Sequence, residues 1–236
     1  VASFSSDHFS ASSGAVSLKA DGIDSTHLDY GTGTNQINTD ALTEGSNNTA
    51  YGYGALSTDT LGSKNTAIGS AALFAQNFTT ATNSYNTAVG DSAGAAVTTG
   101  TDNTLIGGLA GDAITTGSGC TIVGKGAGTA ITTGGDNTGI GKQALENTTT
   151  GTSNTAVGKD ALEANTTADN NTAVGFKSLE ANTVGHSNTA VGYETGKALT
   201  TGDNNIAIGY RALYTEDTGN RSVAIGDFAL TVQNND

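Results

Sequence analysis

The sequence predicts an all-β fold, a repetitive parallel β-roll (β-solenoid) of eleven coils, most of them 17 residues long. Three observations predict it: a pentad that recurs at a fixed spacing, a glycine that ends every pentad, and an exchange of large side chains between two positions of the repeat. Composition alone indicates disorder, because Leu, Ile, Val and Phe make up 42 of 236 residues and the net charge is −13. A strict repeat instead favours stacked coils, each touching its neighbours.

The repeat begins at Asn48 with Asn-Thr-Ala-Tyr-Gly, and positions are numbered from that residue in each unit. Equivalent pentads start at 65, 86, 103, 120, 137, 154, 171, 188, 205 and 222, so the spacing is 17 residues except for one unit of 21. The repeat domain is therefore expected to span 48–230. Residues 1–47 are expected to form short strands and turns that cap the first coil or connect it to a preceding part, and 231–236 a short tail.

Position 5 is glycine in every unit. A chain corner that needs a positive φ, or a close approach of two backbones, explains this choice. The predicted corners are Gly52, Gly69, Gly90, Gly107, Gly124, Gly141, Gly158, Gly175, Gly192, Gly209 and Gly226.

Positions 2 and 4 are expected to share one face of a short strand, because side chains alternate along a strand. Position 2 is mostly Thr but becomes Ile206 and Val223 in the last two units, which indicates that this face is the interior. Position 3, usually Ala, would then lie on the opposite face and press against other copies of the chain. Association is expected because so thin a core buries little area.

Position 9 is Leu in seven units and Gly in four, and each of the four Gly units has an aliphatic residue at position 12. Gly128 with Ile131 is one such pair. Volume needs to be conserved only if both positions point into one packed core, so the exchange predicts that they do.

Several functional classes are disfavoured. The chain has nine Lys and Arg against 22 Asp and Glu, and this acidic balance argues against nucleic acid and anionic membranes as partners. No apolar run approaches the ~20 residues of a membrane helix. Cys120 is the only cysteine, so an internal disulfide is excluded. His8, His27 and His186 follow no catalytic or zinc-binding spacing. The sequence therefore predicts neither an enzyme nor a cofactor or metal site, and its turn aspartates lack the spacing of calcium-binding rolls.

Two polar columns have alternative interpretations. Asn at position 1 is expected to form a stacked amide ladder that satisfies backbone groups of the turns, with Cys120 replacing one rung, or else an exposed amide row for glycans. Thr at position 13 recurs in seven coils and leaves ice binding open. Ice-binding arrays typically carry two outward Thr separated by one residue, whereas the second Thr here is adjacent, at position 14.

Position 6 is the strongest candidate for a contact site. If it faces outwards, cations and aromatic rings line one edge of the rod, where rings can stack on sugars. The alternative is a ladder that stabilises the roll or lies in a subunit interface. The 21-residue unit adds Phe74 and Phe78, which could form a second contact site or be buried against a neighbouring chain. The position 6 candidates are Lys125, Lys142, Lys159, Phe176, Tyr193 and Tyr210.

Ser-Val-Ala-Ile-Gly at 222–226 and Asn-Ile-Ala-Ile-Gly at 205–209 resemble the head repeats of trimeric autotransporter adhesins, the YadA-like β-roll. Asn-Thr-Ala-Val-Gly at 86, 154, 171 and 188 resembles repeats of phage tail fibres, and 21–40 is similar to linker segments of marine phage tail fibres. The resemblance implies a left-handed, homotrimeric β-roll on a virion or bacterial cell surface, which attaches to a host glycan or protein receptor. The alternative is a subunit of an extracellular filament that polymerises end to end through open coil edges.

Overall fold

The computed structural model describes residues 9–12, 15–18, 47–215 and 218–231, and this part of the chain contains strands and turns but no helix. No segment of it could therefore cross a membrane as a helix. Strands β1 (Phe9–Ser12) and β2 (Ala15–Leu18) lie within the segment 1–47 and pair antiparallel. The rest of that segment, and the predicted tail beyond Thr231, lie outside the described residues.

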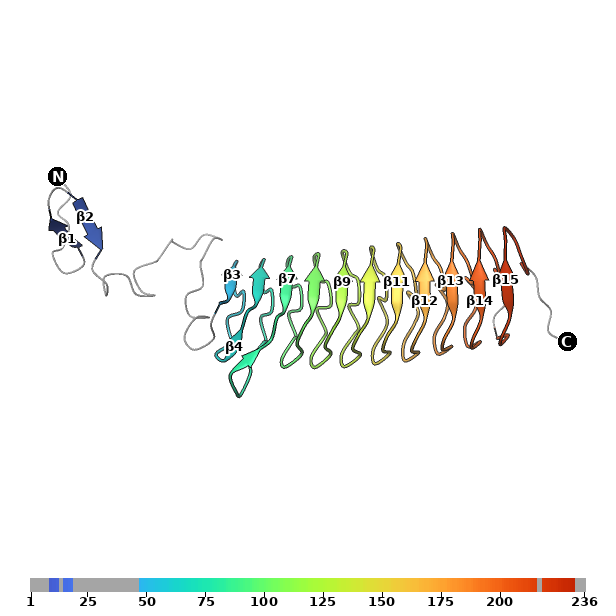
Figure 1. The fold of residues 1–236 in the computed structure, drawn as a ribbon, viewed down its shortest axis with the longest axis horizontal. Helices are drawn as coiled ribbons and strands as arrows, with labels where there is room; N and C mark the ends of the chain where they lie inside the picture. Colours follow the sequence, from blue (N-terminus) through green and yellow to red (C-terminus); the bar gives the residue numbers. More distant parts are fainter. Residues whose placement is uncertain (1–8, 13–14, 19–46, 216–217, 232–236) are drawn as a thin grey trace.

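One parallel sheet of eleven strands runs the length of the repeat domain, with neighbouring strands contributed by successive coils (Figure 1). The pairing joins equivalent positions, for example Thr155 with Thr172 and Val157 with Val174. The predicted parallel β-solenoid with 17 residues per coil is thereby confirmed. Its strands are β3 (Thr49–Tyr51), β5 (Thr66–Ile68), β7 (Thr87–Val89), β8 (Thr104–Ile106), β9 (Thr121–Val123), β10 (Thr138–Ile140), β11 (Thr155–Val157), β12 (Thr172–Val174), β13 (Thr189–Val191), β14 (Ile206–Ile208) and β15 (Val223–Ile225).

The 21-residue unit accommodates its additional residues outside the main sheet, next to a small second sheet. Strand β6 (Thr82–Asn83) pairs parallel with β4 (Gly62–Ser63) of the preceding coil. The additional residues form the loop that projects below the roll between β4 and β7 in Figure 1. The register of the main sheet is unaffected, since Thr66 still pairs with Thr87.

The predicted corner glycines are confirmed, and both reasons for glycine apply. Gly158 has a φ of +139°, which L side chains rarely adopt. A Cβ built on it would lie 2.4 Å from the carbonyl oxygen of Gly175 in the next coil. The coils therefore stack with their corner backbones in direct contact.

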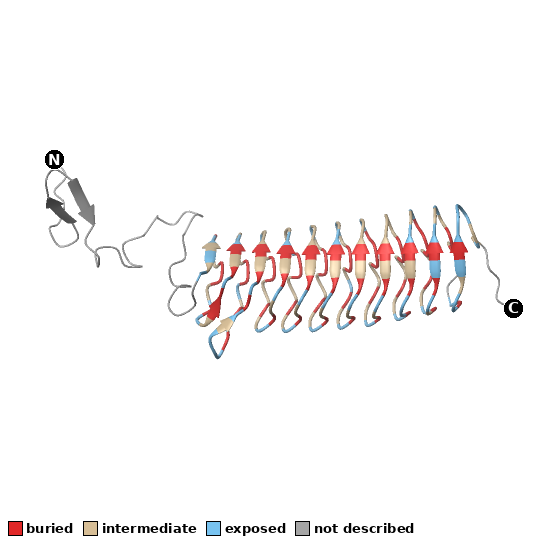
Figure 2. Ribbon diagram, viewed as in Figure 1, coloured by how far each residue is buried: buried red, intermediate tan, exposed pale blue. Residues whose placement is uncertain are grey.

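The two faces of the sheet are the reverse of the prediction. Ala156 and Ala173, at position 3, are completely buried, whereas Thr155 and Val157, at positions 2 and 4, are half-buried and face outwards. In Figure 2 each central strand accordingly carries a buried band between more exposed residues. The physical reason is the narrow roll: only a small residue at position 3 leaves room for the leucine that enters from the opposite wall. Position 3 alanine therefore forms the core and no subunit interface.

The predicted exchange between positions 9 and 12 is confirmed in atomic detail. A Cβ built on Gly111 would lie 2.7 Å from Cδ1 of Ile114, so the isoleucine fills the space that leucine uses in other coils. Side chains at position 3 also exchange volume between coils, which the sequence analysis did not predict. Ile122 is large and fully buried, and in the next coil Gly139 provides the space, since a Cβ there would lie 3.3 Å from Cδ1 of Ile122.

Candidate functional site

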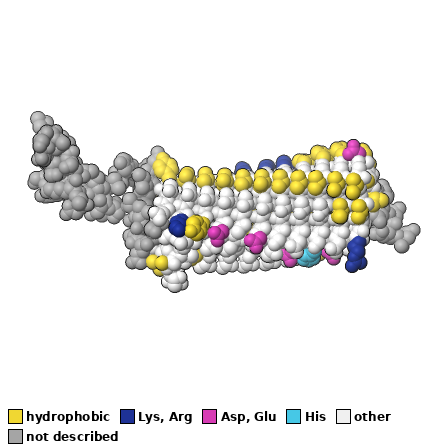
Figure 3. Space-filling model, in the orientation of Figure 1, with side chains coloured by type: hydrophobic (Ala, Val, Ile, Leu, Met, Phe, Trp, Pro, Cys, Tyr) yellow, Lys and Arg dark blue, Asp and Glu magenta, His cyan; other side chains and the backbone are white. Residues whose placement is uncertain are grey.

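An apolar stripe runs along the outer face of the main sheet. It consists of the position 4 side chains, and Figure 3 shows it as a continuous hydrophobic row over the described roll. The exposed fraction of its side chains is 37% for Ile68, 40% for Ile140 and 65% for Ile225 in the last coil. Contiguous apolar rows of this kind on a soluble protein typically mark an interaction surface. The members are Tyr51, Ile68, Val89, Ile106, Val123, Ile140, Val157, Val174, Val191, Ile208 and Ile225.

A row of outward threonines at position 2 accompanies the apolar stripe. Thr155 and Val157 are separated by one residue, and the same spacing recurs from coil to coil. The position 13 threonines, predicted as the alternative array, are instead engaged between coils: the hydroxyl of Thr132 donates to the carbonyl of Thr149 at 3.2 Å. The outward threonine array is therefore on the sheet.

The aromatic half of the position 6 column is a stack of rings. The ring centroids of Phe176 and Tyr193 are 5.2 Å apart, those of Tyr193 and Tyr210 are 5.3 Å apart, and both pairs are stacked. Phe228 closes the row with its ring at 71° to Tyr210. Tyr193 and Tyr210 are 43% and 39% exposed, but through their edges and hydroxyls, because the faces pack on each other. The rings are brought together as expected, and their role in sugar binding stays a prediction.

The lysines of the position 6 column differ in whether they have a partner. Lys159 forms an ion pair with Asp160, and its ammonium lies 5.3 Å from the centroid of the Phe176 ring. Lys125 and Lys142 are exposed and make no ion pair with any described residue. Both line an open groove of about 270 Å³.

A ladder of ion pairs follows the C-terminal coils beside the aromatic stack. Lys177 pairs with Glu180, and Lys197 with both Glu180 and Glu194. Arg211 also pairs with Glu194, at 2.6 Å. Burial opposes ionisation of Glu194, but hydrogen bonds from Lys197 and Arg211 hold its pKa below the ordinary value. These charges are therefore engaged within the roll.

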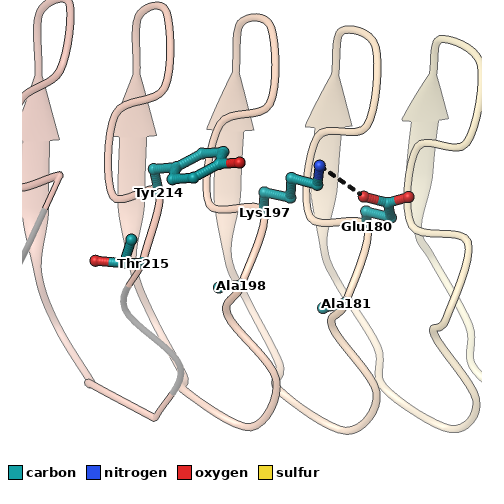
Figure 4. Close-up of a pocket in the computed structure, with 6 residues that line it drawn as sticks. All are labelled: Glu180, Ala181, Lys197, Ala198, Tyr214 and Thr215. Atoms are coloured by element: carbon teal, nitrogen blue, oxygen red, sulfur yellow. Dashed lines mark ion pairs between the residues drawn. The ribbon is translucent and has the colours of Figure 1, made fainter.

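A second groove, of about 350 Å³, adjoins this ladder (Figure 4). Glu180, Lys197 and Tyr214 come from three successive coils, and Ala181 and Ala198 form its floor. The Lys197 and Glu180 charges at its edge are 3.5 Å apart, and they satisfy each other.

The aromatic residues of the 21-residue unit separate into two kinds. Phe78 is only 7% exposed, so its predicted role as a surface contact is not available, and it is buried by its own chain. Phe74 is 45% exposed beside Gly54. Tyr85 is also exposed, and its hydroxyl accepts a hydrogen bond from Lys64 at 2.9 Å.

The position 1 asparagines form the stacked amide ladder that the sequence predicted, and most of them are buried. The Asn154 side chain donates to the carbonyl of Ala168 in its own coil at 2.8 Å, and its oxygen accepts from the backbone of Asn171 at 3.0 Å. These amides are not exposed to glycans. Cys120 replaces one rung of the ladder: its N–H donates to Asn103, and its thiol donates to the carbonyl of Gly134 at 3.4 Å, where the other coils use an amide.

The turn aspartates and His186 also serve the backbone. The N–H of Asp169 donates to Nδ1 of His186 at 2.9 Å, and the N–H of His186 donates to Asp203 at 2.7 Å. His8 and His27 lie outside the described residues. This arrangement caps turns and resembles no catalytic group.

Asp160, Glu163 and Glu180 bring three carboxylates within 4.8 Å of one another. Lys159 and Lys177 already neutralise Asp160, so the cluster has its own counter-charges. Partial burial, followed by the charges of Asp160, Glu146 and Glu180, raises the pKa of Glu163. Burial and like-charge repulsion, partly relieved by lysines, are sufficient to describe this group.

Comparison of the chain with protein families, with curated proteins and with solved structures finds no match.

Proposed function

We propose that this protein is the rod segment of an extracellular attachment fibre, on a virion tail or a bacterial surface, and that its copies associate through the apolar stripe. A repetitive β-solenoid is compatible with a fibre-like structural protein. The single observation that carries the proposal is the continuous outward row of position 4 side chains.

The stripe suits a second copy of the chain better than an unrelated globular partner. It is straight, one side chain wide, and repeats at the strand spacing of about 4.8 Å, so another copy in parallel offers the same spacing. Closed cyclic symmetry would bury the stripe of every copy at a common axis. A left-handed homotrimer is the arrangement that the adhesin-like pentads imply, and it is the one we favour.

The proposed fibre attaches without catalysis. A rod of eleven coils presents the same shallow surface many times, and association of copies multiplies it. Weak contacts to a host cell-surface glycan or protein receptor then add through effective concentration. Neither nucleic acid nor membrane insertion is part of this proposal.

The mass in solution, measured by light scattering, tests the association. We expect about three times 23.3 kDa for the chain as it is. Ile140→Asp combined with Val191→Asp places charges on the stripe and should give a folded monomer. Thr150→Asp with Thr167→Asp, exposed outside the sheet, is the matched control and should keep the mass. A monomeric wild type contradicts the proposal, and an open-ended series of masses would instead favour end-to-end filaments.

The same face supports ice binding as a second candidate. Thr155 and Val157 exemplify an outward Thr-x-Val row on a parallel sheet, the one-residue separation typical of ice-binding arrays. This function requires the face to be free of other copies. A monomer with thermal hysteresis, lost in Thr155→Lys, would support it over the fibre.

A further inference from the structure

Among the lysines of the position 6 column, Lys125 and Lys142 stand out because no carboxylate of the described residues pairs with them. Lys159, Lys177, Lys197 and other cations of the C-terminal coils pair with carboxylates. Lys125 and Lys142 have neither an ion pair nor a side-chain hydrogen bond to any described residue, in a chain of net charge −13. They occupy the same position in adjacent coils, so their backbones are about 4.8 Å apart. Two unpaired ammonium groups at this spacing repel each other and attract an anion.

The groove beside them exists because two side chains are missing. Gly126 follows Lys125 and lines the groove, and Gly108 takes the place of Lys125 in the preceding coil. A Cβ on Gly126 would meet nothing nearer than Gln143 at 3.8 Å, and one on Gly108 nothing nearer than 4.0 Å. The hollow of about 270 Å³ is therefore open between Leu109 and the two lysines.

The other walls of the groove are of different chemistry. Leu109 is 41% exposed and offers an apolar surface. Glu146 lines the opposite side, where its carboxylate accepts a hydrogen bond from Gln143 at 2.8 Å. One groove thus combines two free cations, an apolar contact and a carboxylate acceptor.

We propose that this groove binds an acidic saccharide, with its sulfate, phosphate or carboxylate group between Lys125 and Lys142. Sugar hydroxyls can donate to Glu146, and the C–H face of the ring can pack on Leu109. DNA offers a similar anion but has no free sugar hydroxyl within the strand to donate to Glu146, so it should bind less tightly than an acidic saccharide. The inference rests on the proposed attachment function and names the receptor chemistry for it.

The experiment measures binding of the full chain to immobilised dextran sulfate, polygalacturonate and unmodified dextran at low ionic strength. We expect binding to one or both acidic polymers but not to dextran, and the two acidic polymers distinguish sulfate from carboxylate. Lys125→Gln with Lys142→Gln should raise the Kd by about tenfold or more. Lys64→Gln with Arg221→Gln removes the same charge elsewhere and should change the Kd by less than about twofold.

One further variant and one further ligand separate a built site from general attraction. Leu109→Ser should weaken binding to the acidic polysaccharide, whereas a single-stranded DNA of similar charge should bind weakly or not at all. The proposal is overturned if neither acidic polymer binds, if both double variants lose binding alike, or if DNA binds as tightly. The oligomeric mass is measured on the same samples, so a failure of this site remains distinguishable from a failure of the proposed fibre.

Discussion

Cδ1 of Ile131 lies 2.9 Å from the place where Gly128 would carry a Cβ, so one side chain uses the space of the other. Gly128 has a φ of +59°, and Leu145, the equivalent residue of the next coil, has a φ of 58°. The φ angle at position 9 is therefore nearly the same whether leucine or glycine is present. The volume that is free in the core decides whether a coil has leucine or glycine at position 9.

Ile131→Ala should destabilise the fold by about 2–5 kcal/mol, because it leaves that coil without a large residue at either position. Adding Gly128→Leu should recover only a small part of this loss. Leucines occupy that backbone conformation elsewhere, but the large Ile122 at position 3 of this coil lies 3.3 Å from the place of the new Cβ. Urea denaturation of both variants is the measurement. An unchanged midpoint for the single variant would show that the two positions do not share a core.

Ala156→Glu should prevent folding, because Ala156 is fully buried inside its own coil and a carboxylate there has no partner. Thr155→Glu, one residue earlier on the outward face, is the control and should fold. Circular dichroism at low protein concentration compares the two. Dissociation of Ala156→Glu into folded monomers would return position 3 to the subunit interface.

Cys120→Asn should stabilise the protein by about 1 kcal/mol, because it restores a rung of the amide ladder. The new side chain can donate to the carbonyl of Gly134, where the cysteine sulfur now lies at 3.4 Å, and accept from the backbone of Asn137. Asn154→Ala is the reciprocal variant and should cost more, because it leaves the N–H of Asn171 without its acceptor. Thermal unfolding of both variants gives the sign of each effect.

Glu163→Gln should stabilise the protein at neutral pH and have little effect in acid. The pKa of Glu163 is raised in the folded state from its ordinary 4.5, so the folded chain holds this proton more tightly than the unfolded chain. Its contribution is therefore fully present below pH 4.5 and is lost as the pH rises through the raised value. The difference in stability between variant and wild type, followed from acid to neutral pH, should grow in that direction. A difference that is constant with pH contradicts the argument.

The period, the corners and the core exchange could be predicted because each is written in the sequence as a repeated choice of residue. Gly158 and its equivalents never vary, and Gly128 is balanced by Ile131 within four residues. The prediction of which strand face lies in the interior was wrong. It rested on Ile206 and Val223, which were interpreted as core although they are 40% and 58% exposed. The residues at position 3 carry a better signal for the buried face of the strand.

That signal is the exchange of volume between Ile122 and Gly139, which only an interior position requires. The position 6 column could be found from sequence, but the direction of its rings could not. Stacking of Tyr193 on Tyr210 depends on side-chain rotation, which residue types do not determine. The free charges of Lys125 and Lys142 likewise follow from which carboxylates the coil brings near them.

The hydrogen bonds between coils all run along the length of the roll, as the pairing of Thr155 with Thr172 shows. A pulling force along the fibre therefore acts in the direction of these bonds. It breaks them one coil at a time and does not shear many of them together. Each coil that opens would release 17 residues, roughly 56–61 Å of chain at the length of an extended residue. A single roll under tension would thus lengthen in regular steps, and sharing the load between associated copies would be its main mechanical protection.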